Sequence, residues 1–438
     1  MEFIIEYVNF YLKFRGPDFT KDVIINKIRF IHNLLHMTGE VTLQPFVSQS
    51  GNIVCLFNGE IYNYKQFGDY KSDGCCLIDV YQKYGTKFVK ELDGEFAIVL
   101  FDFSKNIFIC STDVFATKPI WLAIENRQFG ISSYESALKR LEFTNSVKIP
   151  ANTTLVYNLR TLKLVETFTV FDFNLEQKSD SYDGWITAFD NAIKKRAQNT
   201  TYDVFVCLSS GYDSGTICCA LNKLAIPYFT YTIEANENID VMNKRFEINK
   251  TTCKENIYYK LTEKDFFRQR TYLKKSCENF VYYIPNQKVT VMSEDKGAVG
   301  ISYIFKQASS SKRRVYLSGQ GVDEIYSDYG FAGHKYYKHS QFGGLFPSDL
   351  TAIFPWVSFY DGTQKSYLGK EENVSGGWGI EGRYPFLDKY VVQEFLWLKA
   401  ELKNKYYKAP LHMYMQNESY PFDEGVKIGF KADTNLVV

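Results

Sequence analysis

The chain has 438 residues, enough for two or three domains with complete hydrophobic cores. Its 51 basic and 50 acidic residues leave a net charge of +1, so no overall field favours nucleic acid or a membrane surface. The nine cysteines show no paired metal-ligand spacing, and no apolar run approaches the ~18 residues of a transmembrane helix. The N-terminus lacks a signal-peptide pattern, so we expect a cytoplasmic protein with reduced, mostly buried cysteines.

Residues 1–172 predict an α+β domain. Short apolar or alternating runs indicate antiparallel strands, and residues 104–106 predict a hairpin turn between two of them. The Asn58-Gly59 pair is a second hairpin-turn signal. The expected strands are 53–57, 95–103, 107–111 and 120–124, and the expected helix is 76–84.

Residues 173–438 have a different rhythm after a polar stretch at 171–180. Short apolar strands alternate with helical segments, which predicts a doubly wound parallel sheet. The expected strands are 204–208, 228–233, 257–261 and 315–318, and the expected helices are 185–196 and 296–307. From about residue 340 we expect loop-rich chain with one helix after Leu387. The basic runs 194–196 and 312–314 are expected at solvated helix ends.

A polar loop follows the strand at 204–208 and opens a helix. It consists of Leu208, Ser209, Ser210, Gly211, Asp213 and Ser214, with Tyr212 between them. Free backbone N–H groups and the helix dipole favour an anion at such a loop, and Asp213 can hold Mg²⁺. A capped strand–helix turn explains the same residues. If Ser210 needs a positive φ, a residue other than glycine costs on the order of 1 kcal/mol there.

A second such loop follows the strand at 315–318 and contains Ser318, Gly319, Gly321, Asp323 and Glu324. Ligands bind beyond the carboxyl ends of parallel strands, so the two loops are expected to face one nucleotide. Their carboxylates would then hold Mg²⁺ on the leaving pyrophosphate. An acidic helix start explains the second loop when it is taken alone, but the presence of the first loop favours the Mg²⁺ site.

Two further stretches are ambiguous when taken alone. Glu381 and Arg383 read equally well as a structural ion pair or as site residues. Lys408 looks like an ordinary surface lysine.

Taken in order, these motifs resemble the asparagine synthetase family and its β-lactam synthetase relatives. The stretches that carry the resemblance are 15–18, 58–63, 72–73, 92–97, 113 with 118–119, 209–214, 318–324, 379–388 and Lys408. The resemblance covers essentially the whole chain. It implies a four-layer α-β-β-α, Ntn-hydrolase-like amidotransferase domain at 1–172, followed by an α/β ATP pyrophosphatase domain at 173–438.

The resemblance also implies a reaction and a site. A carboxylate would attack the α-phosphate of Mg-ATP, and a nitrogen nucleophile would then displace AMP. The first loop and Ser318 with Gly319 would bind ATP, Ile233 would lie near adenine, and Asp213 and Asp323 would serve Mg²⁺. Lys408 would stabilise developing charge, and Glu381 would lie near the amine.

Two of the departures from the family pattern bear on the source of nitrogen. Glu2 stands where the family has its N-terminal nucleophilic cysteine, and a carboxylate cannot replace that thiol. We therefore predict no glutamine hydrolysis, with Asn58, Gly59 and Asp73 left from a degenerate glutaminase site. Gln320 stands where asparagine synthetases usually carry Glu and β-lactam synthetases Tyr. A neutral amide cannot accept a proton, which leaves Glu381 as a candidate base.

The sequence therefore predicts an ATP- and Mg²⁺-dependent, AMP-forming amide ligase. Its partners are expected to be a small carboxylate, such as aspartate, and ammonia or an organic amine, with no nucleic acid or membrane. Ring closure or peptide formation, a catalytically inactive scaffold and RNA base modification are the alternatives, and a homodimer is left open.

Overall fold

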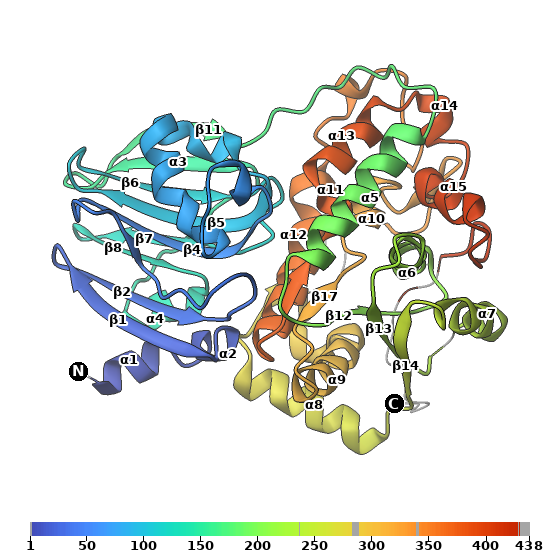
Figure 1. Ribbon diagram of the computed structural model, residues 1–438, viewed down its shortest axis with the longest axis horizontal. Helices are drawn as coiled ribbons and strands as arrows, with labels where there is room; N and C mark the ends of the chain where they lie inside the picture. The colour runs from blue at the N-terminus through green and yellow to red at the C-terminus, as the bar shows by residue number, and fades with distance from the viewer. Residues whose placement is uncertain (1, 236, 283–288, 339–340, 428, 430–438) are drawn as a thin grey trace. The chain divides into compact units, whose positions relative to one another are not determined.

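The computed structural model describes the chain except for residues 1, 236, 283–288, 339–340, 428 and 430–438, and the side chains of residues 2–4 are also outside the description (Figure 1). The chain divides into two compact units, Met1–Asp172 and Phe173–Val438. The division falls inside the polar stretch 171–180, which separates the strand-rich part of the sequence from the part in which strands and helices alternate.

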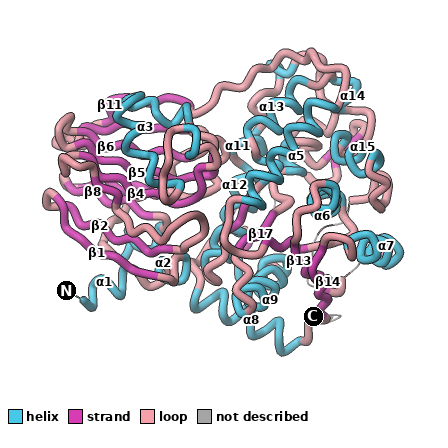
Figure 2. The backbone as a smooth tube through the Cα atoms, viewed as in Figure 1, coloured by secondary structure: helices cyan, strands magenta, loops and turns pink. Residues whose placement is uncertain are grey.

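The first unit consists mainly of antiparallel strands, drawn in magenta in Figure 2. Its largest sheet has six strands in the order β11-β10-β6-β5-β4-β3, accompanied by a three-stranded sheet, β8-β7-β9, and by the β1-β2 hairpin. The strands are β1 (Phe19–Ile25), β2 (Ile28–Leu34), β3 (Phe46–Val47), β4 (Ile53–Ile61), β5 (Gly94–Asp102), β6 (Ile107–Thr112), β7 (Trp121–Glu125), β8 (Gln128–Ser132), β9 (Val147–Lys148), β10 (Thr153–Asn158) and β11 (Leu164–Thr169). The helices are α1 (Glu2–Val8), α2 (Leu12–Arg15), α3 (Leu77–Tyr84) and α4 (Glu135–Arg140).

The core of this unit follows from alternation along its strands. Val54, Val99 and Phe101 of the six-stranded sheet share one buried cluster with Phe30 of β2 and Leu122 of β7. Side chains two residues apart on a strand face the same side, so this sheet buries one face against the smaller sheets. The antiparallel α+β prediction for this unit is confirmed.

The predicted hairpin turn at Asn58-Gly59 is wrong. Both residues lie inside β4 and pair in register with Ala97 and Phe96 of β5. Gly59 has a φ of 127°, and a Cβ there would lie 1.9 Å from the carbonyl oxygen of Glu95. Glycine is required here because the neighbouring strand approaches closely and the backbone is left-handed.

The second unit is built on a parallel sheet of order β14-β13-β12-β17-β20, which confirms the parallel-sheet prediction. From β12 the chain adds strands β13 and β14 toward one edge of the sheet, and from β17 it adds β20 toward the other edge. The direction in which strands are added therefore reverses between β12 and β17. The strands are β12 (Val204–Cys207), β13 (Tyr228–Ile233), β14 (Cys253–Tyr259), β17 (Val315–Leu317) and β20 (Glu381–Arg383). Outside this sheet lie the short strands β15 (Val281–Tyr282), β16 (Thr290–Val291), β18 (Gly330–Phe331) and β19 (His334–Lys335).

Helices cover both faces of this sheet. Phe205 of β12 packs against Phe305 of α9 on one face, while α5 lies beside α13 on the other (Figure 1). The helices are α5 (Asp183–Gln198), α6 (Tyr212–Lys223), α7 (Ile239–Asn249), α8 (Glu263–Ser276), α9 (Lys296–Ser310), α10 (Val322–Ile325), α11 (Val357–Tyr360), α12 (Gly362–Gly376), α13 (Lys389–Trp397), α14 (Ala400–Lys403) and α15 (Ala409–Asn417). A reversal in strand order between two helix-covered halves places the ligand crevice beyond β12 and β17.

Three local predictions for this unit need correction. The expected helix after Leu387 is α13, but the described chain after residue 340 holds five α-helices rather than one, and buried side chains line α12, α13 and α15. The basic run 194–196 is not wholly solvated: Arg196 is buried and its Nη1 lies 2.7 Å from Asp388 Oδ2. The run 312–314 is also not wholly solvated, because the Arg313 guanidinium lies 3.6 Å from the centre of the Phe229 ring.

Candidate functional site

The two polar loops meet at the point where the strand order reverses. The first loop follows β12 and ends at α6, and the second loop follows β17 and ends at α10. Strands β12 and β17 are hydrogen-bonded neighbours in the sheet. A Cβ added to Gly319 would lie only 2.7 Å from the Cβ of Asp213. Glycine at 319 therefore lets the second loop touch the first.

Hydrogen bonds within the first loop hold it in a tight turn. The Ser209 N–H donates to Ser214 Oγ at 3.0 Å, and the Gly211 N–H donates to Ser209 Oγ at 3.2 Å. The N–H and hydroxyl of Ser210 both donate to the Glu237 carboxylate at 2.5 Å. A carboxylate therefore already lies on this loop, which agrees with an anion-binding role for its N–H groups.

The expected strain at Ser210 is absent, because this residue has no positive φ. Its hydroxyl also accepts the Asn238 N–H at 3.0 Å. The Ser210 hydroxyl thus adds links between the first loop and the chain that leads into α7, and a glycine would keep only the N–H link to Glu237.

Arg245 of α7 lies buried beneath the first loop and was not predicted from the sequence. Its guanidinium donates to the carbonyl oxygens of Ser209 at 2.5 Å and Gly211 at 2.9 Å. Burial lowers its pKa from the ordinary arginine value, but an arginine remains charged in proteins. A Cβ at Gly215 would lie 2.4 Å from Arg245 Nη2. The glycine inside α6 was therefore the sequence feature that could have indicated a buried group packed against this helix.

Lys408 joins the carboxylates of the two loops and is not a surface lysine. Its Nζ lies 2.6 Å from Asp213 Oδ1 and 2.9 Å from Asp323 Oδ1, and its side chain is 2% exposed. Burial opposes its positive charge, but the two carboxylates outweigh burial and hold the pKa of Lys408 well above its usual value. Lys408 also has a φ of 50°, an uncommon conformation that costs on the order of 1 kcal/mol.

Asp323 has a second cationic partner, which the sequence did not suggest. Lys427, near the end of the described chain, pairs with Asp323 Oδ2. Burial would raise the pKa of Asp323, but Lys408 and Lys427 together lower it below its usual value. Glu324 is buried beside Tyr329, whose hydroxyl donates to it, and burial raises the pKa of Glu324 to about 7.

Leu208 and Ile233 lie where the sequence predicted, at the carboxyl ends of neighbouring strands. The Leu208 N–H donates to the Tyr231 carbonyl at 2.9 Å, and Ile233 ends β13 as a buried core residue. Their backbones therefore border the first loop on the side of β13.

Ser318 connects the second loop to a buried glutamate on α12. Its hydroxyl donates to Glu371 Oε2 at 2.6 Å and accepts the Gln320 N–H at 3.0 Å. Burial, strengthened by neighbouring Glu372, raises the pKa of Glu371 to about 7 against the opposing effects of Ser318, Lys370 and Tyr316. Burial raises the pKa of the Cys207 thiol at the end of β12, and the negative charge of Glu371 raises it further.

The neighbouring amide of Gln320 is not saturated: its Nε2 is buried and has no hydrogen-bond partner among the described residues.

Glu381 is not with the other predicted residues. It begins β20, where it pairs with Val315 at the first residue of β17, so it lies at the sheet edge away from the loops. Its Oε1 lies 2.7 Å from Nε of the fully buried Arg383, whose Nη1 also donates to the carbonyl of Arg196 at 2.7 Å. The ion-pair alternative is therefore the one that the geometry supports.

The residues of the degenerate glutaminase site lie in the first unit. Asp73 accepts the Ile61 N–H at 2.9 Å, while the buried Asn58 Nδ2 has no partner among the described residues. Glu2 begins α1, and its side chain lies outside the described residues. Burial raises the pKa of the Cys55 and Cys76 thiols, so neither is a ready nucleophile.

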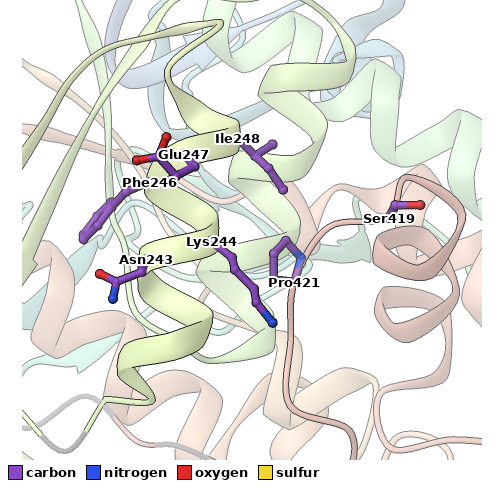
Figure 3. A pocket seen from close by; sticks show the side chains of 7 residues that line it. All are labelled: Asn243, Lys244, Phe246, Glu247, Ile248, Ser419 and Pro421. Atoms are coloured by element: carbon purple, nitrogen blue, oxygen red, sulfur yellow. The ribbon is translucent and has the colours of Figure 1, made fainter.

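A hollow of about 600 Å³ lies elsewhere, where α7 faces the chain that follows α15 (Figure 3). Its lining residues are Asn243, Lys244, Phe246, Glu247, Ile248, Ser419 and Pro421. None of the loop residues lines it.

The described residues contain no cluster of three or more His, Cys, Asp or Glu side chains able to hold a metal ion. Asp213 and Asp323 nonetheless fit Mg²⁺, which proteins usually hold through one or two carboxylates together with substrate phosphates. No helix in the described part of the chain has the length and apolar character needed to cross a membrane.

Two family models match this chain. A glutamine amidotransferase domain model matches residues 2–169, and an asparagine synthase model matches residues 185–361. A Methanocaldococcus jannaschii protein named as a glutamine-hydrolyzing asparagine synthetase is 25% identical over 430 residues, covering 90% of this chain and 74% of that protein. The asparagine synthetase of Triphysaria versicolor is 24% identical over 420 residues and covers 90% of this chain.

The chain spans 66% of the length of the Triphysaria relative, just under two thirds. Among solved structures, a glutamine phosphoribosylpyrophosphate amidotransferase from B. subtilis has 13% identity and a TM-score of 0.31, covering 59% of this chain and 78% of its own. The two matches give this chain an amidotransferase-type domain followed by an asparagine-synthase-type domain. The chain belongs to the asparagine synthetase family.

We expect Lys408→Met to lower the free energy of unfolding by about 3 kcal/mol, because it leaves the Asp213 carboxylate without its cation. Adding Asp213→Asn should recover part of this loss by removing the uncompensated charge. Urea unfolding followed by tryptophan fluorescence suits this test, since four of the five tryptophans lie beyond residue 172. Lys405→Met, at an exposed lysine, is the control, and an unfolding midpoint of Lys408→Met equal to that of this control would contradict the expectation.

Proposed function

We propose that this protein is an ATP-dependent, AMP-forming amide ligase. It adenylates a small carboxylate, such as aspartate, and joins it to ammonia or to a substrate amine. The observation that carries the proposal is the pair of loops whose carboxylates, Asp213 and Asp323, share the buried Lys408. Intramolecular or peptide-type amide formation, as in β-lactam synthetases, is the alternative outcome for the amine.

Each part of the site has a role in this reaction. The N–H and hydroxyl groups from Ser209 to Ser214 bind the β- and γ-phosphates, with the charge of Arg245 beneath the loop. Asp213 and Asp323 hold Mg²⁺, which neutralises phosphate charge when it is bound with ATP. Ile233 contacts adenine through its backbone. The substrate carboxylate attacks the α-phosphate, and Lys408 stabilises the charge that develops there.

The amine that attacks the adenylate must lose a proton, and Glu371 is the proposed acceptor. Gln320 is a neutral amide, and Glu381 is paired with Arg383 at the other edge of the sheet. Glu371 is hydrogen-bonded to Ser318 in the same loop as Gln320, and its pKa is about 7. A base with a pKa near the working pH combines adequate ionisation with adequate basicity.

The first domain is proposed to have the four-layer Ntn-hydrolase arrangement without glutaminase activity. Glu2 stands at the position of the family's nucleophile. The close approach of Glu95 accounts for Gly59 without any catalytic role. Nitrogen would therefore come from ammonia or from an amine on the substrate.

Pyrophosphate release from Mg-ATP should rise well above background with the right carboxylate in a panel that includes aspartate, assayed with and without ammonium. Asp213→Ala should abolish the release, while glutamine should yield no glutamate. No release with any carboxylate, together with no ATP binding by calorimetry, would instead support an inactive scaffold. Glutamate formation by the pure protein would contradict the loss of glutaminase activity.

The rate of amide formation should depend on Glu371 through its pKa. The carboxylate is the form that accepts a proton, so the rate should rise as pH increases through about 7. Glu371→Gln should lose this rise and slow amide formation at least 100-fold, the usual range for a lost base, while ATP–pyrophosphate exchange continues. Glu372→Gln, at the adjacent buried carboxyl, should keep the rise but move it to lower pH, because Glu372 helps to raise the pKa of Glu371. An unchanged pH profile in Glu371→Gln would exclude this role.

A further inference from the structure

Four tyrosines from four separate segments gather between the second loop and α12. They are Tyr282 of β15, Tyr329 after α10, Tyr337 after β19 and Tyr367 of α12. Their rings form two edge-to-face pairs. The ring centres of Tyr329 and Tyr337 lie 4.9 Å apart at 85°, and those of Tyr282 and Tyr367 lie 6.1 Å apart at 75°.

One member of each pair is buried and fixed by its hydroxyl group. The Tyr329 hydroxyl donates to Glu324, and the Tyr282 hydroxyl donates to Asp295, which caps the start of α9. A ring whose hydroxyl is held in this way cannot turn freely. These two tyrosines therefore give the cluster a rigid base.

The other member of each pair is partly exposed. Tyr337 and Tyr367 pack edge-on against the buried rings, yet neither is fully covered by the described chain. Tyr367 also lies one helical turn before Glu371 on α12, so the two side chains share a face of that helix. Part of the aromatic surface is thus left open beside the proposed base.

These two rings lie near the carboxylate that binds Lys408. Burial raises the pKa of Tyr337, the charge of Asp323 raises it further, and the charge of Lys408 lowers it. Burial also raises the pKa of Tyr367, and Asp323 is among the carboxyls that add to this rise. Both rings therefore lie within electrostatic range of the point where the carboxylate substrate is proposed to react.

The ammonium groups that lie over these rings already have anionic partners. Lys370 Nζ lies 4.7 Å from the centre of the Tyr367 ring and 3.6 Å from Asp295 Oδ2, and Lys427 is paired with Asp323. Free aspartate would bring a second carboxylate, which neither ammonium group could bind without weakening its own ion pair. An uncharged aromatic ring requires no such exchange.

We propose that the carboxylate substrate of this ligase carries an aromatic ring, which packs against Tyr337 and Tyr367. Aromatic rings prefer edge-on or offset contacts, and partly exposed tyrosines held by a rigid base offer such contacts at little entropic cost. This inference narrows the substrate class of the proposed function and rests on it, because it assumes that a carboxylate is adenylated between the two loops.

ATP–pyrophosphate exchange tests the inference, because it measures adenylation without the amine. The probes are phenylacetate, 3-phenylpropionate, aspartate and glutamate. The value of kcat/KM should be roughly tenfold higher for the better aromatic acid than for aspartate or glutamate. Tyr367→Ala and Tyr337→Ala should each lower the value for that aromatic acid about tenfold, with the KM for ATP changed by no more than about twofold.

Two further variants complete the test. Tyr367→Phe keeps the ring and should retain most of the exchange activity with the aromatic acid. Tyr390→Ala, at a tyrosine of α13 that is 49% exposed, should behave like the wild type.

The contrary outcomes are distinct. Faster exchange with aspartate or glutamate than with either aromatic acid would overturn this inference and leave the adenylation chemistry in place. A KM for ATP that rises as much as the exchange falls in both alanine variants would show that the tyrosines only maintain the fold, which would also overturn it. Mg-ATP binding by the wild type without exchange for any of the four acids would overturn this inference alone, whereas no ATP binding at all would contradict the proposed function as well.

Discussion

The buried ammonium of Lys408 is the interaction on which the site depends. Asp213 and Asp323 come from two loops more than 100 residues apart, yet both lie within 3 Å of one nitrogen atom. Two partly desolvated carboxylates at the head of one sheet would repel each other without it. The cation therefore holds the two loops together until Mg²⁺ and ATP bring their own charges.

The parallel sheet explains why these loops meet, and its main strands could be predicted from the sequence. Val204 to Cys207 and Tyr228 to Ile233 are short apolar runs bounded by polar turns, which is the pattern of buried parallel strands. The Lys408 position could not be predicted in the same way. Lysine is normally exposed, and its burial here depends on carboxylates that are distant in sequence. Family resemblance, rather than local pattern, identified it.

The errors of prediction have related physical causes. Asn-Gly is a turn signal in isolation, but Gly59 is needed inside a strand because the Glu95 carbonyl approaches it closely. Arg196 has the sequence context of a solvated helix end, but Asp388, almost 200 residues away, draws it into the core. Arg245, Glu371 and Lys427 gave no local signal for the same reason: each acquires its role from a tertiary partner.

The transfer of oxygen from the carboxylate substrate to the nucleotide tests the central claim most directly. In an adenylating ligase, the substrate carboxylate attacks the α-phosphate and one of its oxygens leaves with AMP. With ¹⁸O-labelled carboxylate, chosen as the one that releases most pyrophosphate, mass spectrometry should find one ¹⁸O atom in AMP for each amide formed. Unlabelled AMP, or ADP with ¹⁸O in inorganic phosphate, would contradict cleavage at the α-phosphate by attack of the carboxylate.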